Sequence, residues 1–450
     1  VKQLGGYAEV VSDMEYNVAK RLGYDNEKII YNGPYKTELS IEHLLAGGIL
    51  NIDNIEEVKK VCVVAEAHTE KQLKVGIRVN INIGQCFISR FGIDSDNSDL
   101  DLAFYLLKES GVKVEGLHCH IGQSRTIQAW KNRAEVMLTL ADKYFPAEPP
   151  KYLNLGSGMF AVMKPSLAEQ FGDNIPSFEQ YAAAVAIPFA EHYASLPEEK
   201  KPILFTEPGT TIVNSYIDFV GRVDSIKRIK GQDIVVMDCS KHMIGDICQI
   251  KQLPIDVICC SEEQIELNNA NFVGYTCLEH DVMYTAYHGK LGVGDYVVFA
   301  NVGGYSNNFK PPFIAPNCAM CELDENGNSR VIKRREEFDD VFITYIFYMR
   351  DLTILTTASG AQFMPGLVSC LHNNGERKVK VIGVDMKSDE TLLQMVDEYF
   401  LVPSASDPHY VDALLEICSN EKVDVLMPFM SSELEELQRR RSEFKAVGTM

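Results

Sequence analysis

The sequence lacks any apolar run near the ~18 residues that a transmembrane helix needs; its longest apolar stretches are Tyr181–Ala190 and Val341–Met349. Basic residues are also few, since 43 Lys and Arg against 63 Asp and Glu give a net charge of −20. Such a charge repels nucleic-acid phosphates and anionic lipids, so neither nucleic acid nor a membrane is expected as a partner. Small-molecule chemistry is the favoured class of function.

A disulfide framework is missing as well. The 12 cysteines are scattered through apolar contexts and no secretory segment precedes them, which predicts free thiols and a cytoplasmic protein. Only Cys318 and Cys321 form a Cys-x-x-Cys pair, and no second pair lies at zinc-site spacing, so no metal is expected. The first residue is Val1 rather than Met, which indicates a processed chain or a fragment.

The 450 residues have the composition of an ordinary globular protein, with 46% hydrophobic residues, and their number predicts about three domains. In residues 1–211, short β-rich runs alternate with amphipathic segments, which predicts parallel strands joined by right-handed crossovers. We interpret this part as an α/β domain, a (β/α)8 barrel without its first strand. The seven predicted strands are Tyr7–Ser12, Lys28–Gly33, Ile49–Asn54, Lys74–Asn80, Lys113–His120, Lys151–Gly158 and Pro202–Gly209. The predicted helices are Ser40–Ala46, Ile55–His68, Leu100–Glu109, Ile127–Tyr144 and Phe178–Ala194.

Two further domains are predicted after the barrel. Residues 212–340 contain close-set β segments separated by glycines, which indicates a mainly antiparallel β domain. Its predicted strands are Ile212–Val223, Asp233–Asp238, Phe272–Cys277, Tyr296–Asn301 and Ala319–Glu322. Residues 351–450 return to a βαβ pattern, typical of a Rossmann-like domain. Strands are predicted there at Leu352–Thr357, Val379–Asp385, Glu398–Val402 and Val423–Pro428, with one helix ending at Leu371 and another over Tyr410–Asn420.

Three predicted barrel strands end in residues that could bind a ligand or take part in catalysis. Barrel enzymes place their active sites at the carboxyl ends of their strands. The backbone of Gly156-Ser157-Gly158 could close on a phosphate, or form only a tight turn. Glu207 could hold a ring nitrogen or a metal, or cap a helix. His118 and His120 lie on one face of their strand and could bind a metal or stack on a ring, although such histidines are more often structural.

Together, His120-Ile121-Gly122, Gly156-Ser157-Gly158 and Glu207-Pro208-Gly209 resemble motifs of the fold-type III pyridoxal-phosphate decarboxylases, the ornithine and diaminopimelate decarboxylase family. The resemblance covers about residues 1–340. It implies a decarboxylase that uses pyridoxal phosphate, takes a small amino acid and works as a homodimer with shared active sites. Other matching segments are Arg78, Arg90-Phe91-Gly92-Ile93, Thr276-Cys277 with Asp281, Gly294-Asp295 and Gly303-Gly304-Tyr305.

The resemblance also implies roles for single residues. Glu207 would keep the pyridine nitrogen protonated, and His120 would stack on the ring. Cys277, from the neighbouring subunit, would return a proton to the substrate carbon; its other interpretation is a buried structural thiol. The further cofactor-binding residues implied are Arg78, Gly156, Ser157, Gly158, Gly209, Thr210 and Tyr305.

Departures from the family pattern bear on activity and substrate. The cofactor-linking lysine of the family lies on the first barrel strand, which is expected before Val1, so the chain as printed is predicted to lack it and, with it, activity. Leu278 replaces an acidic residue that reads the distal amine of a substrate. Glu279 or His280 would take over that role, with Asp246 as a further candidate.

The last domain carries a second resemblance. Thr357–Gly366, Gly383-Val384-Asp385 and Val423–Pro428 look like the domain that precedes the nucleotide-binding part of ATP-grasp carboxylate–amine ligases. The resemblance implies that ATP and Mg²⁺ bind only in a longer parent protein, beyond residue 450. Three residues of the strand-to-helix turn could approach a substrate or serve the turn alone: Gly360, Gln362 and Pro365.

We therefore predict a bifunctional enzyme, an amino-acid decarboxylase fused to the start of a ligase, in which the amine made by one part could feed the other. Two alternatives stay open. One is an amino-acid racemase on the same barrel. The other is a non-catalytic scaffold for dimerisation or pyridoxal-phosphate binding, which the missing strand and Leu278 favour.

Overall fold

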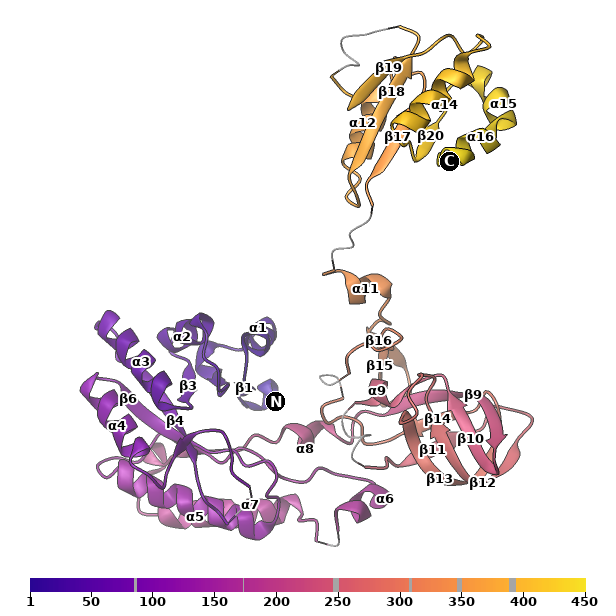
Figure 1. Ribbon diagram of the computed structural model, residues 1–450. Coiled ribbons are helices and arrows are strands. Elements are labelled where there is room, and N and C mark those ends of the chain that lie inside the picture. Colours follow the sequence, from indigo (N-terminus) through magenta and orange to yellow (C-terminus); the bar gives the residue numbers. More distant parts are fainter. Residues whose placement is uncertain (85–86, 173, 246–250, 307–309, 346–349, 388–393) are drawn as a thin grey trace. The chain divides into compact units, whose positions relative to one another are not determined.

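The computed structural model describes residues 1–84, 87–172, 174–245, 251–306, 310–345, 350–387 and 394–450. They form two compact units, Val1–Glu336 and Glu337–Met450, which Figure 1 colours from indigo to yellow along the sequence. Within the described ranges, none of the helices combines the length and apolar composition that a transmembrane span requires.

The first sheet is entirely parallel and follows the path β1-β2-β3-β4-β6-β7-β8, with β5 beside β4. All seven predicted barrel strands are present. Among the described strands β8 and β1 do not pair, and the rings of Tyr7 and Phe205 meet at this seam with centroids 4.8 Å apart. The predicted barrel short of one strand is thus confirmed. The strands are β1 Ala8–Val10, β2 Ile29–Tyr31, β3 Ile49–Ile52, β4 Lys74–Asn80, β5 Ile93–Asp94, β6 Lys113–His118, β7 Tyr152–Asn154 and β8 Ile203–Phe205.

Helices alternate with these strands, and side chains cap several of their first turns. Ser12, Thr37, Asn54, Thr126 and Ser177 each accept a hydrogen bond from a backbone N–H of the helix that follows. Four of these caps begin helices that the apolar periodicity predicts, whereas α1, capped by Ser12, was not predicted. The main helices of this unit are α1 Asp13–Arg21, α2 Glu38–Leu45, α3 Ile55–Ala67, α4 Asp99–Glu109, α5 Ile127–Tyr144 and α7 Phe178–His192.

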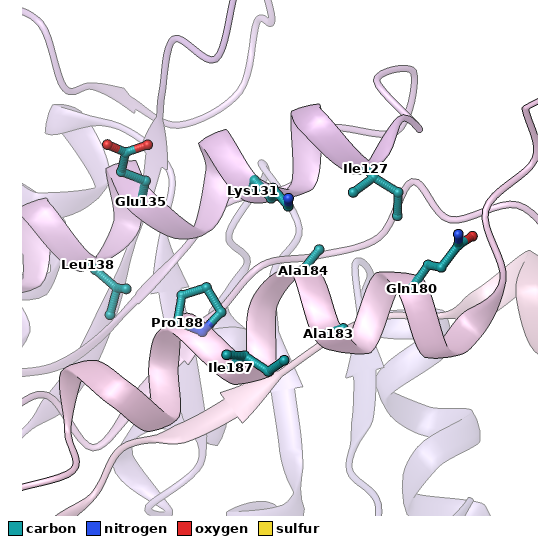
Figure 2. Close-up of a pocket in the computed structure, with 9 residues that line it drawn as sticks. All are labelled: Ile127, Lys131, Glu135, Leu138, Gln180, Ala183, Ala184, Ile187 and Pro188. Carbon is teal, nitrogen blue, oxygen red and sulfur yellow. The ribbon is translucent and has the colours of Figure 1, made fainter.

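A groove of about 710 Å³ lies between α5 and α7 (Figure 2). Its lining residues all come from these two helices and none from a strand end, so the groove is separate from the edge of the sheet where barrel enzymes carry out their chemistry. The lining residues are Ile127, Lys131, Glu135, Leu138, Gln180, Ala183, Ala184, Ile187 and Pro188.

The second sheet of the first unit has the order β11-β14-β9-β10-β12-β13. All neighbours are antiparallel except β10 and β12, which are parallel, so the predicted mainly antiparallel domain is confirmed. A separate hairpin pairs β15 with β16. The strands are β9 Phe219–Ile229, β10 Gln232–Met237, β11 Ile255–Ile258, β12 Ile265–Val273, β13 Val282–Leu291, β14 Tyr296–Phe299, β15 Met320–Leu323 and β16 Ser329–Lys333.

Two strand predictions in this domain are wrong in part. Ile212–Val223 was predicted as one strand, but Gly209–Val213 forms the short helix α8 and β9 begins only at Phe219. A short apolar run does not distinguish a helical turn from a strand. Phe272–Cys277 was also predicted as a strand, yet β12 ends at Val273, because the N–H of Gly274 bonds to the carbonyl of Asp281 and starts a turn.

Asp295 organises the turn before β14. Its carboxylate, fully buried, accepts hydrogen bonds from the N–H groups of Cys260 and Ser261 at 2.7 Å and of Gly292 at 2.8 Å. Burial alone would raise the pKa of Asp295, but the hydrogen bonds from Ser261, Cys260 and Gly292 lower the pKa below its ordinary value. Unfolding therefore exposes a carboxyl of higher pKa than the folded one.

We expect Asp295→Asn to lower the free energy of unfolding by about 2 kcal/mol at pH 7, because one oxygen that accepts a backbone N–H becomes a donor. The wild-type protein should lose this stabilisation as the pH falls below the unfolded carboxyl pKa of 3.8, so the two proteins should converge in acid. Urea denaturation between pH 7 and 3 measures both effects, with Asp224→Asn, an exposed strand position, as the control. A difference that does not change with pH would contradict this account.

The second unit is a parallel sheet with the order β19-β18-β17-β20. Its four strands and two of its helices lie where the sequence predicts them, so the predicted Rossmann-like domain is confirmed. The last two helices were not predicted. The elements are β17 Leu352–Thr356, α12 Met364–His372, β18 Val379–Asp385, β19 Glu398–Leu401, α14 Tyr410–Asn420, β20 Val425–Met427, α15 Ser431–Arg439 and α16 Arg441–Ala446.

Candidate active site

Glu207, just after β8, lies among nitrogen atoms from the ends of other barrel strands. The amide nitrogens of Asn32 and Asn154 donate to Oε1 at 2.7 and 2.8 Å. The Nδ1 atom of His120 lies 2.8 Å from Oε2, and Nε2 of His118 lies 3.2 Å from Oε1. The structure thus brings the predicted pair Glu207 and His120 into direct contact.

Glu207 is ionised in this setting. Burial alone would raise the pKa of its carboxyl, but the charge and contact of His118 and the hydrogen bond of His120 hold the pKa well below its ordinary value. Burial also lowers the pKa of His118 more than the nearby carboxylate raises it. Hydrogen bonds from Asn32, Asn154 and His120 stabilise the same carboxylate.

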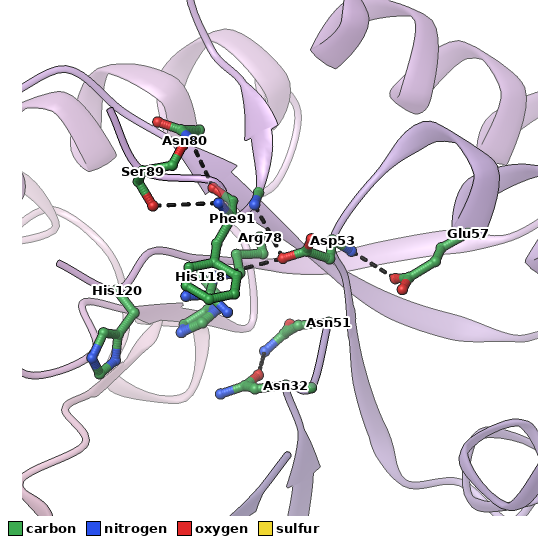
Figure 3. A network of polar contacts seen from close by, with 12 residues as sticks. Asn32, Asn51, Asp53, Glu57, Arg78, Asn80, Ser89, Phe91, His118 and His120 are labelled. Atoms are coloured by element: carbon green, nitrogen blue, oxygen red, sulfur yellow. Dashed lines mark hydrogen bonds and ion pairs between the residues drawn. The ribbon is translucent and has the colours of Figure 1, made fainter. Parts of the chain in front are cut away.

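Buried asparagines extend the hydrogen-bond network around Glu207 to other strands of the barrel. The amide of Asn51 donates to Asn32 Oδ1 at 2.6 Å, as Figure 3 shows, and accepts from the hydroxyl of Tyr152 at 2.8 Å. Asn154 in turn accepts the N–H of Gly156 at 2.9 Å. Sequence reasoning missed these residues, although asparagines at the ends of apolar strands were a signal that could have revealed them.

Arg78 ends β4 and is buried among other charged groups. Its Nε lies 3.8 Å from Asp53 Oδ1, and its guanidinium group stacks 4.5 Å from the ring centre of Phe91 (Figure 3). Asp53 accepts the N–H of Gly92 at 3.0 Å and donates its own N–H to Glu57. In this structure Arg78 therefore supports the Arg90-Phe91-Gly92 turn, and its predicted cofactor contact stays a prediction.

The turn after β7 requires its glycines. Gly156 has φ 63° and Gly158 has φ 110°. A Cβ on Gly156 would lie 2.5 Å from the carbonyl oxygen of Cys119, and one on Gly158 would lie 2.4 Å from that of Ile121. The turn thus packs directly against the backbone that carries His120.

Arg133 of α5 holds these two segments together from behind. It is fully buried, and its Nη1 donates to the carbonyls of Leu155 at 2.8 Å and Ser157 at 2.7 Å. Its Nη2 donates to Ile121 at 2.9 Å. Sequence reasoning missed Arg133, because a lone arginine in an amphipathic helix resembles any solvent-exposed charge.

The other predicted phosphate-side residues lie close to one another. Gly209 begins α8, and Thr210 follows it. A Cβ on Gly304 would lie 2.7 Å from Thr210 Cγ2, so α8 packs against the Gly303-Gly304-Tyr305 segment of the β domain. Tyr305 itself has φ 59° and is 59% exposed.

Cys277 lies in the turn after β12 and is exposed, so its interpretation as a buried structural thiol is wrong. Buried Asp281 shapes the turn, since its Oδ2 accepts the hydroxyl of Thr276 at 2.6 Å. The ring of His280 lies 6.3 Å from that of His242. Across the described part of the chain, no hydrogen bond or ion pair joins this turn to Glu207. The candidate Asp246 lies outside the described residues.

The donor atoms of His118, His120 and Glu207 lie within 4.8 Å of one another, close enough to hold a metal ion. The sequence suggested the two histidines and, separately, Glu207 as possible metal ligands, and the structure brings the three together. The geometry alone thus allows either a metal or an organic ring with a basic nitrogen at this point.

Comparison with known proteins favours the organic ring. Residues 1–214 match the family described as pyridoxal-dependent decarboxylase, pyridoxal binding domain. This part of the chain is similar to the pyridoxal-binding domain of these decarboxylases. Residues 354–450 of the second unit match the family described as PylC-like, N-terminal domain. Both predicted resemblances are thus confirmed as similarities, one to the pyridoxal-dependent decarboxylases and one to the PylC-like N-terminal domain.

Individual relatives agree. The chain is 25% identical over 351 residues to diaminopimelate decarboxylase of Neisseria meningitidis, covering 75% of this chain and 80% of that protein. It is 24% identical over 374 residues to the L-glutamyl-[BtrI acyl-carrier protein] decarboxylase of Niallia circulans, covering 77% and 83%. These relatives are decarboxylases, and neither supports the racemase alternative.

A solved structure supports the fold. A diaminopimelate decarboxylase from M. jannaschii, in complex with L-lysine, aligns with a TM-score of 0.65 at 22% identity, covering 77% of this chain and 80% of that one. The barrel and β domains together therefore have the fold of the decarboxylases.

Proposed function

We propose that this chain is the decarboxylase part, with the leading domain of a ligase part, of a bifunctional enzyme that removes CO2 from a small amino acid with the help of pyridoxal phosphate. The observation that carries the proposal is the ionised carboxylate of Glu207. It lies among N–H donors, next to His120 and the Gly156–Gly158 turn, inside a domain of the pyridoxal-binding family.

The residues present fit the cofactor. A buried carboxylate of lowered pKa suits a protonated ring nitrogen, and the backbone of a turn too tight for side chains suits a phosphate. When bound, pyridoxal phosphate supplies an electron sink for the carbanion that CO2 leaves behind. Glu207 would hold the proton on the ring nitrogen and His120 would lie on the ring. The phosphate would be held by Gly156, Ser157 and Gly158, with Gly209, Thr210 and Tyr305 on its other side.

The finer parts of the proposal concern partners. Exposed Cys277 would donate a proton in the active site of a second copy of this chain, so the enzyme would be a homodimer. Glu279 or His280 would contact the far end of the amino acid. The enzyme would act in the cytoplasm, and its ligase part would use ATP and Mg²⁺.

The test is CO2 release by the full-length natural protein that contains this sequence, supplied with pyridoxal phosphate and meso-diaminopimelate, L-ornithine or L-lysine. We expect release from at least one of them, and a loss of about 100-fold in kcat/KM in Glu207→Gln, which removes the charge that faces the ring nitrogen. Glu199→Gln, at an exposed position, is the control. If the protein shows no visible absorbance band from bound cofactor and releases no CO2, the proposal is wrong.

Sharing of the active site gives a separate prediction. Cys277→Ala and Glu207→Ala should each be inactive as homodimers, while an equal mixture after subunit exchange should regain about a quarter of wild-type activity, because mixed dimers contain one intact site. The measurement is CO2 release before and after mixing. If exchange is shown by mass and no activity returns, Cys277 does not act across a dimer.

A further inference from the structure

A pocket of about 300 Å³ lies in the second unit and shares no residue with the candidate active site. It borders the carboxyl ends of β17, β18 and β19, the edge at which open parallel α/β sheets bind ligands. Its walls are mostly apolar, with a few polar groups among them, as is usual for small-molecule sites. The lining residues are Ala358, Val384, Asp385, Met386, Val402, Pro403, Ser404, Ala405, Ser406, Tyr410, Met430 and Ser432.

Asp385 supplies the charge of this pocket. Its Oδ2 accepts the N–H of Gly360 at 2.9 Å and its Oδ1 accepts the N–H of Met386 at 2.7 Å, which fixes the carboxylate at the end of β18. None of the described lining residues is a lysine, arginine or histidine, and no ion pair to Asp385 is formed within the described ranges. Each oxygen keeps a lone pair for a further donor.

Tyr410 adds an acceptor to the same pocket. Its hydroxyl donates to the Oε2 atom of Glu433, a carboxylate that is 1% exposed. The other oxygen of Glu433 accepts the hydroxyl of Thr357 at 2.5 Å and the N–H groups of Phe429 and Met430. Because the proton of Tyr410 is committed to Glu433, its oxygen can only accept from a ligand.

The pocket thus offers a carboxylate, a phenolic oxygen that only accepts, and serine hydroxyls, while a second buried carboxylate stands behind the tyrosine. An ammonium group has three donors and no acceptor, and it carries the opposite charge. An anion would meet two carboxylates and no cation. A neutral hydroxyl would gain hydrogen bonds but no charge interaction.

We propose that this pocket binds a small primary amine, with its ammonium group on Asp385 and Tyr410 and its aliphatic part against Val384, Val402 and Met430. The ligase part of the proposed enzyme would bind its amine substrate in this pocket, so this inference rests on the proposed function and extends it. It does not depend on decarboxylation, which rests on Glu207 and His120 in the other unit.

The test is calorimetric titration of the full chain with 1,5-diaminopentane. Glu207→Ala serves as the background, so that amine binding in the barrel does not contribute. We expect saturable binding that Asp385→Asn weakens at least tenfold, the loss of a charge-assisted hydrogen bond. Asp407→Asn is the matched control, because it makes the same change in the same domain at an exposed position that does not line the pocket. The uncharged 1,5-pentanediol should bind at least tenfold more weakly than the diamine.

Three results would overturn the proposal: no binding of the diamine, equal binding by Asp385→Asn and the background protein, or equal binding of the diol. Adenosine is titrated as well, since an acidic residue at the end of the second strand of such a sheet can also hold ribose hydroxyls. Binding of adenosine without the diamine would assign the pocket to a nucleoside. None of these outcomes would affect CO2 release, so failure here and failure of the decarboxylase proposal are distinguishable.

Discussion

Gly158→Ala should abolish tight binding of pyridoxal phosphate and lower the free energy of unfolding by about 3 kcal/mol. The new Cβ would lie 2.4 Å from the carbonyl oxygen of Ile121, a backbone atom that cannot move without displacing the segment that carries His120. The positive φ of 110° adds strain for any residue with a side chain. Fluorescence titration with the cofactor and urea denaturation measure the two effects.

Gly172→Ala is the matched control for this variant. Gly172 has a similar φ of 98°, yet a Cβ there would meet no atom within 4 Å. It should therefore cost only the backbone strain, about 1 kcal/mol, and leave cofactor affinity unchanged. Equal losses of stability and cofactor affinity in the two variants would contradict the claim that close packing of the turn against residues 119–122 supports the fold and the cofactor site.

Arg133→Met should cost about 3 kcal/mol of unfolding free energy. Methionine fills a similar volume and removes a buried charge, but it leaves the carbonyls of Leu155, Ser157 and Ile121 without their donor. The affinity for pyridoxal phosphate should fall as well, since the two segments that Arg133 joins carry the phosphate turn and His120. Urea denaturation and cofactor titration provide the readouts.

Arg133→Lys also tests whether Arg133 links the phosphate turn to the segment that carries His120, in a variant that is more certain to fold. A lysine keeps the charge but cannot donate to three carbonyls from one planar group, so it should recover only part of the lost stability and affinity. If the methionine variant is as stable as the wild type and binds the cofactor equally well, Arg133 is not the link between the two segments.

Much of this architecture could be predicted from the sequence. The alternation of short β-rich runs with helices of period 3.6 located all seven barrel strands and the four strands of the last domain, because buried parallel strands are continuous apolar runs. The β domain was harder. Apolar and polar residues alternate along its strands, and the strands end at turns such as Gly274. For this reason β11, β13 and β16 were missed.

The site was predictable only in part. His120, Glu207 and the glycine turn are short motifs that a family resemblance can identify. Asn32, Asn51 and Asn154 were missed, since their contacts join strands far apart in the sequence. Arg133 was missed because nothing in a helical pattern distinguishes a buried arginine from an exposed one, and only the fold places it behind the phosphate turn.

Equilibrium binding of pyridoxal phosphate to this chain, compared with the Glu207→Ala and His120→Ala variants, tests the central claim most directly. The account predicts saturable binding by the wild type and at least tenfold weaker binding by each variant, because Glu207 loses its charge at the ring nitrogen and His120 its contact with the ring. Binding that both substitutions leave unchanged would contradict it, and would favour a scaffold in place of an enzyme.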